Sequence, residues 1–194
     1  MFYSHGYLQG FCSCFFISDI EIQISGKTDQ RGNKAMQMRN DISDSREREA
    51  YDALALRALK GLPAAYAPYS GFHVSAALLC ADGTVYDGVN VENSAYSAGI
   101  CAERTAIFKA VSEGKKEFSA IAVTGCHKEW LEKDAYSSRL ELPDYCPPCG
   151  VCRQVMREFG APEEFRIILA KGPAEYKVYK LSELLFDSFG PENL

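Results

Sequence analysis

Residues 90–114 read NVENSAYSAGICAERTAIFKAVSEG and residues 147–154 read PPCGVCRQ, and the rest of the chain is arranged around these two segments. Together they supply Cys101, Cys149 and Cys152 as candidate metal ligands. Three soft sulfur ligands suit a zinc ion that keeps one position open for water, because a closed structural site takes four protein ligands. Glu103 is not needed as a ligand and can reach that open position. The pattern therefore predicts a catalytic zinc site.

All three cysteines lie where helices are expected to begin. Cys101 precedes one predicted helix, and Cys149 and Cys152 lie in the first turn of another. Unpaired backbone N–H groups and the positive end of the helix dipole favour thiolates there. Cys149 and Cys152 also have the spacing that puts both sulfurs on one face of a helix. Zinc held by these sulfurs would make hydroxide available at neutral pH.

Three thiolates carry more negative charge than one zinc ion neutralises, so a nearby cation is expected. Arg104 directly follows Glu103 and is predicted to donate hydrogen bonds to a ligand sulfur. Arg153, which directly follows Cys152, is a second candidate for the same role.

The composition narrows the classes of partner. Of the 194 residues, 47% are hydrophobic and 24% are charged, which fits one globular domain with an appendage. The net charge of −5 argues against nucleic acid as a partner, because phosphate binding needs clustered Lys and Arg. No apolar run reaches the roughly 20 residues of a membrane span, so no membrane partner is expected. The eight cysteines are unevenly placed, which favours metal ligation in a reduced, cytoplasmic setting over a disulfide framework.

The chain divides at about residue 40. Residues 1–40 have no sustained apolar period, and we expect an extension that packs poorly or that precedes a native start at Met36 or Met38. Residues 41–194 carry the regular patterns and form the predicted domain. Strands alternate with helices in it, which predicts an α/β fold, a three-layer α/β/α sandwich.

The domain pattern begins with a helix near Asp44, where Asp44 and Glu47 have the spacing of a capping box, and it stops at Gly61 and Pro63. A hairpin follows, with strands at 72–80 and 84–91 around an Asp-Gly turn. Next come a predicted helix at 101–114 and a buried strand at 118–125. An irregular excursion at 126–145 follows, with a helical turn in EWLEK. The chain ends with a helix after Pro148, two strands in FRIILA and YKVYKL around a turn at 171–173, and one helical turn in SELLF.

The segments NVENSAY, CAERTAIFKAVSEG, PCGVCRQ and AYAPYSGF resemble the small, homotetrameric cytidine deaminases with three cysteine ligands. The resemblance runs from about residue 45 to the C-terminus. It implies the cytidine deaminase-like fold with a mixed five-stranded sheet. It also implies zinc-dependent hydrolysis of cytidine and 2′-deoxycytidine to uridine and 2′-deoxyuridine, with release of ammonia, in pyrimidine salvage. The excursion at 126–145 is longer than is usual in that family.

The resemblance also implies roles for individual residues. Glu103 would take a proton from the zinc-bound water, give it to the ring nitrogen next to the attacked carbon, and later protonate the departing amine. Asn90 and Glu92 would bind the ribose hydroxyls, Phe72 would pack beside the nucleoside, and the Ala102 backbone would meet the base. The remaining implied substrate contacts are Val91, Asn93, Ser94, Ala95, Tyr96 and Phe189, of which Tyr96 and Phe189 would reach into a neighbouring subunit's site.

Three alternatives stay open at this point. Cys146 makes a second Cys-x-x-Cys with Cys149, so a four-sulfur structural zinc site in a non-catalytic module is possible. Another aminopyrimidine nucleoside, of the blasticidin type, could be the substrate of the same zinc core. His73 and His127 could bind metal in principle, but neither has ligand spacing to the cysteines, so a strand or surface role is favoured.

Overall fold

The computed structural model describes residues 44–134 and 142–194. The predicted extension at residues 1–40, with Met36 and Met38, and part of the excursion at 126–145 lie outside the described residues. The described elements, in chain order, are α2 (Ser45–Gly61), η1 (Leu62–Ala64), β1 (Phe72–Cys80), β2 (Val85–Val89), η2 (Tyr96–Ala98), α3 (Ala102–Ser112), β3 (Phe118–His127), α4 (Lys128–Asp134), α5 (Gly150–Phe159), β4 (Arg166–Gly172), β5 (Glu175–Lys180), α6 (Leu181–Leu184) and η3 (Pro191–Asn193).

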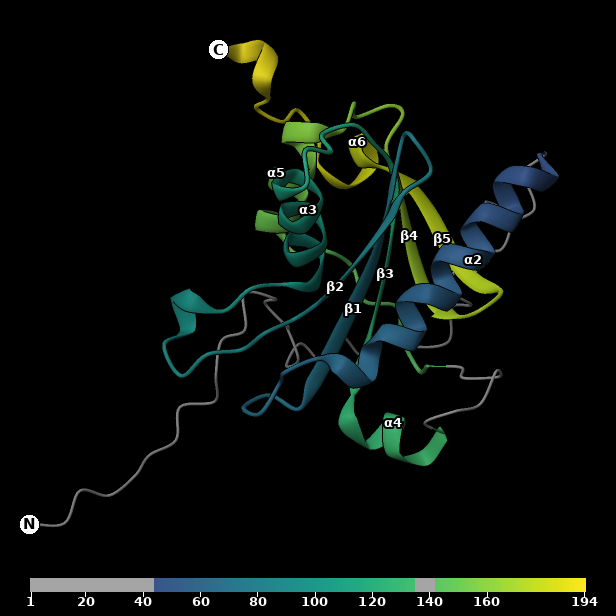
Figure 1. Cartoon of the computed structure of the whole chain (residues 1–194), viewed down its shortest axis with the longest axis vertical. Helices are drawn as coiled ribbons and strands as arrows, with labels where there is room; N and C mark the ends of the chain where they lie inside the picture. Colours follow the sequence, from purple (N-terminus) through teal and green to yellow (C-terminus); the bar gives the residue numbers. More distant parts are fainter. Residues whose placement is uncertain (1–43, 135–141) are drawn as a thin grey trace, which may run out of the picture.

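The strands form one mixed five-stranded sheet in the order β2-β1-β3-β4-β5. β1 pairs antiparallel with β2 and β3, β3 pairs parallel with β4, and β5 pairs antiparallel with β4. Figure 1 shows α2 on one face of the sheet and α3 and α5 on the other. The predicted three-layer α/β/α sandwich with a mixed five-stranded sheet is therefore confirmed.

The sheet begins with the hairpin that the Asp-Gly pair predicts. Leu79 pairs with Val85 across the turn, and Gly83 adopts a positive φ of 86°, a conformation that glycine tolerates best. The second strand ends at Val89, so Asn90 lies directly at the end of β2. The hairpin therefore brings the 90–100 segment to one end of the sheet.

The two faces of the sheet pack differently. The α2 face buries small side chains from helix and strands, including Ala55, Ala58, Ala77 and Ala122. The opposite face carries the larger apolar cluster, which contains Cys101 and Cys152.

Gly88 of β2 allows the start of α3 to lie close to the sheet. A Cβ atom at this position would stand 2.3 Å from the Ala102 carbonyl oxygen and 2.4 Å from the Ala106 nitrogen. A larger residue would push the first turn of α3 away, and with it Cys101 and Glu103. Gly88 therefore connects the packing of the sheet to the position of the cysteines.

Local predictions differ from the structure at the start of α2. Asp44 caps the helix by accepting a hydrogen bond from the Arg46 backbone N–H, but Glu47 does not complete a capping box. The Glu47 carboxylate accepts instead from the Tyr51 hydroxyl. Tyr51 is buried against the sheet, so its hydroxyl needs an acceptor and takes the side chain that the capping box would have used.

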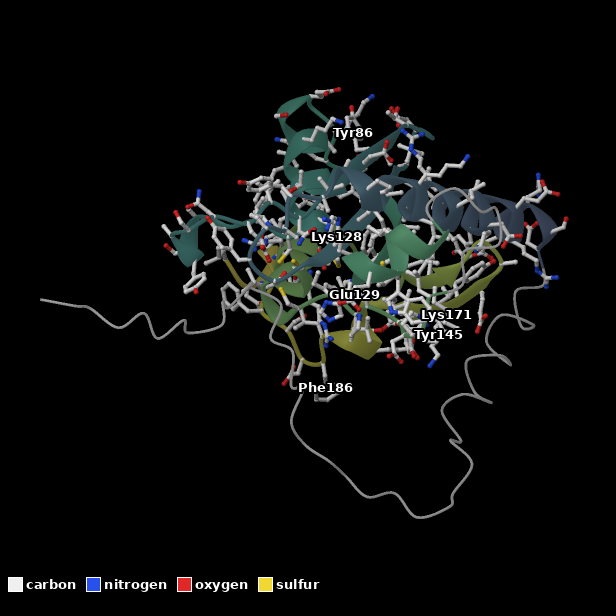
Figure 2. All side chains as sticks on the ribbon, turned by 90° about the horizontal axis from the view of Figure 1, so that it is seen from below. Tyr86, Lys128, Glu129, Tyr145, Lys171 and Phe186 are labelled. Atoms are coloured by element: carbon white, nitrogen blue, oxygen red, sulfur yellow. The ribbon has the colours of Figure 1, made fainter. Side chains whose placement is uncertain are left out.

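The end of the long excursion is attached to the far strands. The Leu142 N–H donates to the Lys171 carbonyl oxygen at 2.7 Å. The Lys171 and Lys177 ammonium groups lie 5.5 Å and 4.4 Å from the centre of the Tyr145 ring, and Figure 2 shows Tyr145 beside Lys171. The chain that leads to Cys149 is therefore fixed on β4 and β5. The helical turn expected in EWLEK is part of α4.

Candidate active site

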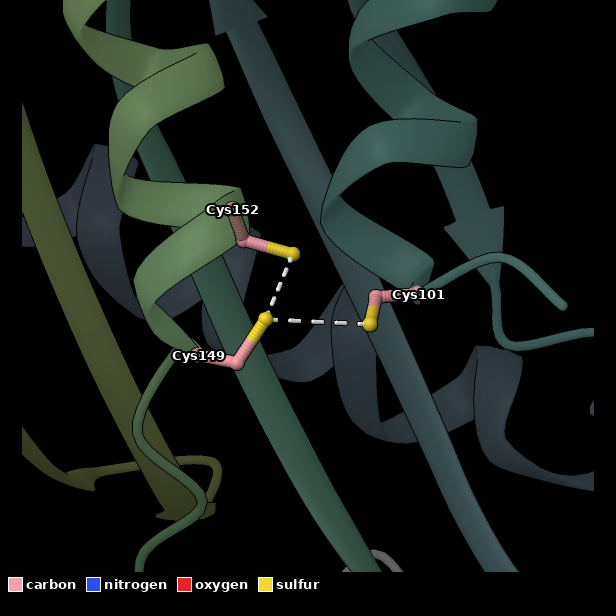
Figure 3. Close-up of side chains that lie close together, drawn as sticks. All are labelled: Cys101, Cys149 and Cys152. Carbon is pink, nitrogen blue, oxygen red and sulfur yellow. Dashed lines mark hydrogen bonds between the residues drawn. The ribbon is translucent and has the colours of Figure 1, made fainter. Parts of the chain in front are cut away.

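Three sulfur atoms meet where α3 and α5 begin. Cys101 is the N-cap residue of α3, Cys149 is the N-cap of α5, and Cys152 lies in the first turn of α5. The Cys149 sulfur lies 4.0 Å from that of Cys101 and 3.4 Å from that of Cys152, and all three lie within 4.8 Å of one another. Figure 3 shows the three side chains pointing toward one another from the starts of the two helices. Tetrahedral zinc with ordinary Zn–S bonds separates its sulfur ligands by about 3.8 Å. The predicted ligand set therefore fits zinc.

No other group of three or more His, Cys, Asp or Glu side chains is close enough to share a metal in residues 44–134 and 142–194. Cys146, the fourth sulfur of the alternative closed site, is not part of the cluster. It is buried beside Gly125, where a Cβ atom on the glycine would stand 2.9 Å from the Cys146 sulfur. The His73 ring nitrogen Nδ1 contacts the Leu62 carbonyl oxygen at 3.1 Å, and His127 packs against Phe72. The described structure thus gathers three sulfurs and leaves one position of a tetrahedral ion for another ligand.

Contact among the sulfurs has an electrostatic consequence. Hydrogen bonds with Cys101, which has the larger effect, and with Cys149 raise the pKa of the Cys152 thiol, and burial raises this pKa further. A positive charge at the centre of the cluster is what would let all three thiols ionise together.

Arg104 supplies part of that positive charge. Its Nη2 donates to the Cys101 sulfur at 3.4 Å, as the sequence predicted. Burial opposes the charged guanidinium, but the hydrogen bond to Cys101 and the charges of the cysteines raise the pKa of Arg104 overall. The alternative cation, Arg153, does not take this role: it donates to the Pro148 and Leu184 carbonyl oxygens, both at 2.7 Å, and so joins the start of α5 to α6.

Glu103 lies buried at the cluster. Its side chain is 1% exposed, and burial raises its pKa to about 7. Hydrogen bonds to its carboxyl, from its own backbone first and then from Cys152, partly oppose that rise. Its Oε2 atom has no hydrogen-bond partner among the residues that the structure describes. A carboxyl with a pKa near neutrality can both accept and release a proton under physiological conditions.

A second set of polar groups surrounds the end of β2. Asn90 is buried, and its side chain accepts from the Val74 N–H at 2.8 Å and donates to the Phe72 carbonyl oxygen at 2.9 Å. The Glu92 carboxylate accepts from the backbone N–H groups of Tyr69 and Ser70. Asn90 and Glu92 are therefore fixed against the segment that leads into β1.

The segment between these residues and Cys101 folds back on itself. Val91 and Ile100 exchange two backbone hydrogen bonds, of 3.0 Å and 2.9 Å, and so close the loop between them. This closure places Glu92 and Cys101 at the two ends of one small loop. Within it, Asn93 caps a turn by accepting from the Ala95 N–H. The exposed residues of the loop include Val91, Asn93, Ser94, Ala95 and Tyr96. Ala102 is fully buried at the start of α3.

The predicted aromatic contacts lie in different surroundings. The Phe72 ring is half-buried and packs edge-on against His127, with ring centroids 5.0 Å apart. Tyr96 and Phe189 are 46% and 59% exposed, and each presents an apolar face to solvent. Phe186, which the sequence analysis did not single out, is 91% exposed and projects outward in Figure 2. Exposed aromatics at these places suit contacts with another molecule.

Sequence reasoning also missed Ser70, whose hydroxyl donates to the Glu92 carboxylate at 2.5 Å. The available signal was the turn APYSG just ahead of β1, where a serine hydroxyl has nearby backbone groups to bond. The partner, however, is far along the chain, and spacing alone does not reveal it.

Comparisons with known proteins agree with this geometry. Residues 48–167 match the family model of the cytidine and deoxycytidylate deaminase zinc-binding region. The chain is 40% identical over 141 residues to the cytidine deaminase of Halalkalibacterium halodurans, covering 73% of this chain and 95% of that protein. It is 39% identical over 143 residues to the cytidine deaminase of Sporosarcina psychrophila, and this match covers 74% of this chain and 93% of that protein.

A solved structure gives the same result at the level of the fold. The crystal structure of cytidine deaminase from Burkholderia pseudomallei matches this fold with a TM-score of 0.59, and the two sequences are 41% identical. The match covers 71% of this chain and 97% of that chain. Sequence, fold and the three-sulfur cluster thus point the same way, and the chain belongs to the cytidine and deoxycytidylate deaminase family.

Proposed function

We propose that the chain hydrolyses cytidine and 2′-deoxycytidine to uridine and 2′-deoxyuridine and releases ammonia. The observation that carries this proposal lies at the starts of α3 and α5. Three sulfurs there are close enough to share zinc, and the buried Glu103 carboxyl lies against them. Water adds at the ring carbon that bears the amine, and the amine leaves as ammonia, so the overall reaction consumes one water per nucleoside.

The metal would be held by Cys101, Cys149 and Cys152. Bound there, zinc supplies an acidified water as nucleophile at neutral pH. Arg104 keeps a positive charge beside the Cys101 sulfur and offsets the excess negative charge of three thiolates.

Glu103 would carry the proton. Its carboxylate accepts a proton, delivers it to the ring nitrogen beside the attacked carbon, and takes part again when the departing amine is protonated. The pKa of about 7 suits both directions of transfer. The lack of a partner at Oε2 among the described residues is consistent with an atom that bonds to reactants.

The nucleoside would be held by the second polar set. Asn90 and Glu92 would bind the sugar hydroxyls, Phe72 would pack beside the nucleoside and the Ala102 backbone would meet the base. The other proposed contacts are Val91, Asn93, Ser94, Ala95, Tyr96 and Phe189. The two exposed aromatics among these support a homotetramer in which Tyr96 and Phe189 complete a neighbouring copy's site.

The wider setting is also part of the proposal. The deaminase domain would comprise residues 41–194, with residues 1–40 as an extension, and the enzyme would serve pyrimidine salvage in the cytoplasm. The family match at residues 48–167 supports that division. Among the helices of the described residues, none has the length and apolar character needed to span a membrane.

The proposal is tested by mixing zinc-loaded protein with cytidine and following the loss of cytidine absorbance and the release of ammonia. Turnover should stop when a chelator removes the metal and return when zinc is added back. The same assay with a blasticidin-type nucleoside tests the alternative substrate class, because the preferred substrate is the one with the higher kcat/KM. Zinc-loaded protein that leaves cytidine unchanged would contradict the proposal.

A further inference from the structure

We infer that Ser70 is a positioning residue for the substrate's sugar, because its hydroxyl fixes the carboxylate of Glu92. This inference rests on the proposed function, in which Glu92 binds a ribose hydroxyl. Ser70 lies in the turn between η1 and β1, away from the three sulfurs in sequence, and neither its family resemblance nor its spacing assigns it a role.

Three donors hold the Glu92 carboxylate. The Ser70 hydroxyl donates to Oε1 at 2.5 Å, while the Tyr69 and Ser70 N–H groups donate to Oε2 at 2.9 Å and 3.2 Å. An ionised carboxylate offers about four acceptor positions. Three are used here, so the Glu92 side chain is held in one orientation with an acceptor position left for a ligand.

The same hydroxyl reaches the other proposed substrate contacts. The Ser70 Oγ atom accepts from the Phe72 N–H at 3.0 Å, and the Phe72 carbonyl oxygen accepts from Asn90 Nδ2 at 2.9 Å. One continuous series of hydrogen bonds therefore runs from Glu92 through Ser70 and Phe72 to Asn90. Only a side chain that donates and accepts at once can occupy the Ser70 position in this series.

The turn itself does not depend on the Ser70 side chain. The Tyr66 N–H donates to the Asn90 carbonyl oxygen at 3.0 Å, and the Glu92 N–H donates to the Tyr66 carbonyl oxygen at 2.8 Å. Gly71, at a φ of 64°, donates its N–H to the Ala67 carbonyl oxygen at 3.0 Å. These backbone bonds keep the turn in place, so loss of the Ser70 hydroxyl should release Oε1 of Glu92 without unfolding the segment, while the Tyr69 and Ser70 N–H groups still hold Oε2.

The arrangement also sets the chemistry of the group that Glu92 receives. A carboxylate that only accepts hydrogen bonds favours a neutral hydroxyl donor and repels a phosphate. Ser70 would thus sharpen a preference for nucleosides with a free sugar hydroxyl over sugar-phosphorylated nucleotides.

The test compares two substrates across four zinc-loaded proteins: wild type, Ser70→Ala, Ser70→Thr and Ser119→Ala. Ser119 is an exposed serine at the start of β3 and serves as the matched loss of a hydroxyl elsewhere. The substrates are cytidine and 2′,3′-dideoxycytidine, which lacks the 2′ and 3′ hydroxyls of the sugar. The fold-change between substrates within one protein does not depend on how much of the sample is folded.

Ser70→Ala should raise the KM for cytidine on the order of tenfold with kcat nearly unchanged, because a hydrogen bond to a charged group is lost. It should leave kcat/KM for 2′,3′-dideoxycytidine unchanged, and Ser70→Thr should recover most of the cytidine KM. Two additional zinc-loaded proteins, Glu92→Gln and Glu92→Gln with Ser70→Ala, complete the test, and Ser70→Ala should raise the cytidine KM little further in the Glu92→Gln background.

If Ser70→Ala lowers kcat/KM equally for both substrates, or leaves the cytidine KM unchanged, the role of Ser70 is overturned while the proposed function stays intact. If zinc-loaded wild type does not deaminate cytidine, the proposed function and this inference fall together. The wild-type arm therefore separates the two failures.

Discussion

Glu92 and Glu103 are two buried glutamates at opposite ends of one closed loop, and their surroundings differ in the supply of hydrogen-bond donors. Glu92 receives a hydroxyl and two backbone N–H groups from the turn before β1. Glu103 lies between helix starts and sulfurs, and its Oε2 has no partner in the described part of the chain. Burial raises the pKa of Glu103 to about 7.

This difference shows how one side-chain type takes two roles in one site. A carboxylate surrounded by donors is held as a fixed acceptor that orients a ligand. In Glu103, burial outweighs the hydrogen bonds that the carboxyl receives, so its pKa of about 7 lets it accept and release protons. The proposed division between sugar binding and proton transfer follows from the donors that each segment offers.

Glu103→Gln should give the largest effect, a fall in kcat on the order of a thousandfold, because the amide cannot carry the proton. The substitution keeps the size and shape of the side chain, so zinc content and the cytidine KM should stay close to wild type. Single-turnover kinetics together with metal analysis would check this. A Glu103→Gln protein that keeps most of its kcat would break the contrast between the two glutamates.

Arg104→Ala should come next, with a zinc affinity about 10- to 100-fold weaker, because the Cys101 sulfur loses its charged hydrogen-bond donor. The zinc affinity of Arg104→Lys should lie between those of wild type and Arg104→Ala, since lysine keeps the positive charge without the planar guanidinium. Competition with a chromophoric chelator measures the affinity. Arg57→Ala, which removes an exposed arginine paired with Asp87, is the control and should bind zinc like wild type. Equal affinities for Arg104→Ala and Arg57→Ala would contradict the assigned role.

Glu92→Gln should have a smaller effect that appears in a different kinetic constant. Replacing the carboxylate by a neutral acceptor should raise the cytidine KM on the order of tenfold and leave kcat and zinc content nearly unchanged. Steady-state kinetics beside Glu103→Gln would then show one variant changed in KM and the other in kcat. A fall in kcat without a change in KM would mean that Glu92 also takes part in the chemical step.

Much of this site could be predicted because its key features are local in sequence. Cys149 and Cys152 share one helical turn, Glu103 follows Cys101 closely, and the Asp-Gly pair fixes the β1–β2 hairpin. Each of these depends on short-range geometry that spacing reveals. The alternation of strands and helices was enough to predict the three layers, and α5 begins after the Pro-Pro pair as expected.

The misses involve hydrogen-bond partners that packing selects, one of them four residues away along a helix and the others farther along the chain. Glu47 could have completed a capping box, but the buried Tyr51 hydroxyl takes its carboxylate. Arg153 directly follows the ligand Cys152, and so is closer in sequence to a ligand cysteine than Arg104 is, yet it donates a hydrogen bond to the Leu184 carbonyl oxygen of α6. The bond from Ser70 to Glu92 likewise depends on how two loops meet. Competition among long-range hydrogen-bond partners is decided by tertiary packing, which a single sequence does not display.

Cys126 supplies the smallest predicted effect and tests whether burial alone raises a pKa without creating a reactive site. It is buried among Leu59, Leu62, Leu131 and Leu142, and desolvation raises its pKa to about 11. Like Glu103 it is an ionisable group whose neutral form is favoured by burial, but it faces leucines instead of the metal cluster. We therefore expect it to influence stability and not turnover.

The direction of that influence follows from the pKa in the two states. The folded-state pKa of Cys126 lies above the roughly 8.5 of an unfolded cysteine, so its contribution to stability is complete below that pH and is lost as the pH rises toward 11. The free energy of unfolding of Cys126→Ala should therefore fall less steeply between pH 8.5 and pH 10 than that of wild type, while kcat at pH 7 stays the same. Urea titrations across this range measure the two slopes. Parallel slopes would show that the thiol ionises as easily in the folded protein as in the unfolded chain, and burial would then not be sufficient to explain the raised pKa of Glu103 either.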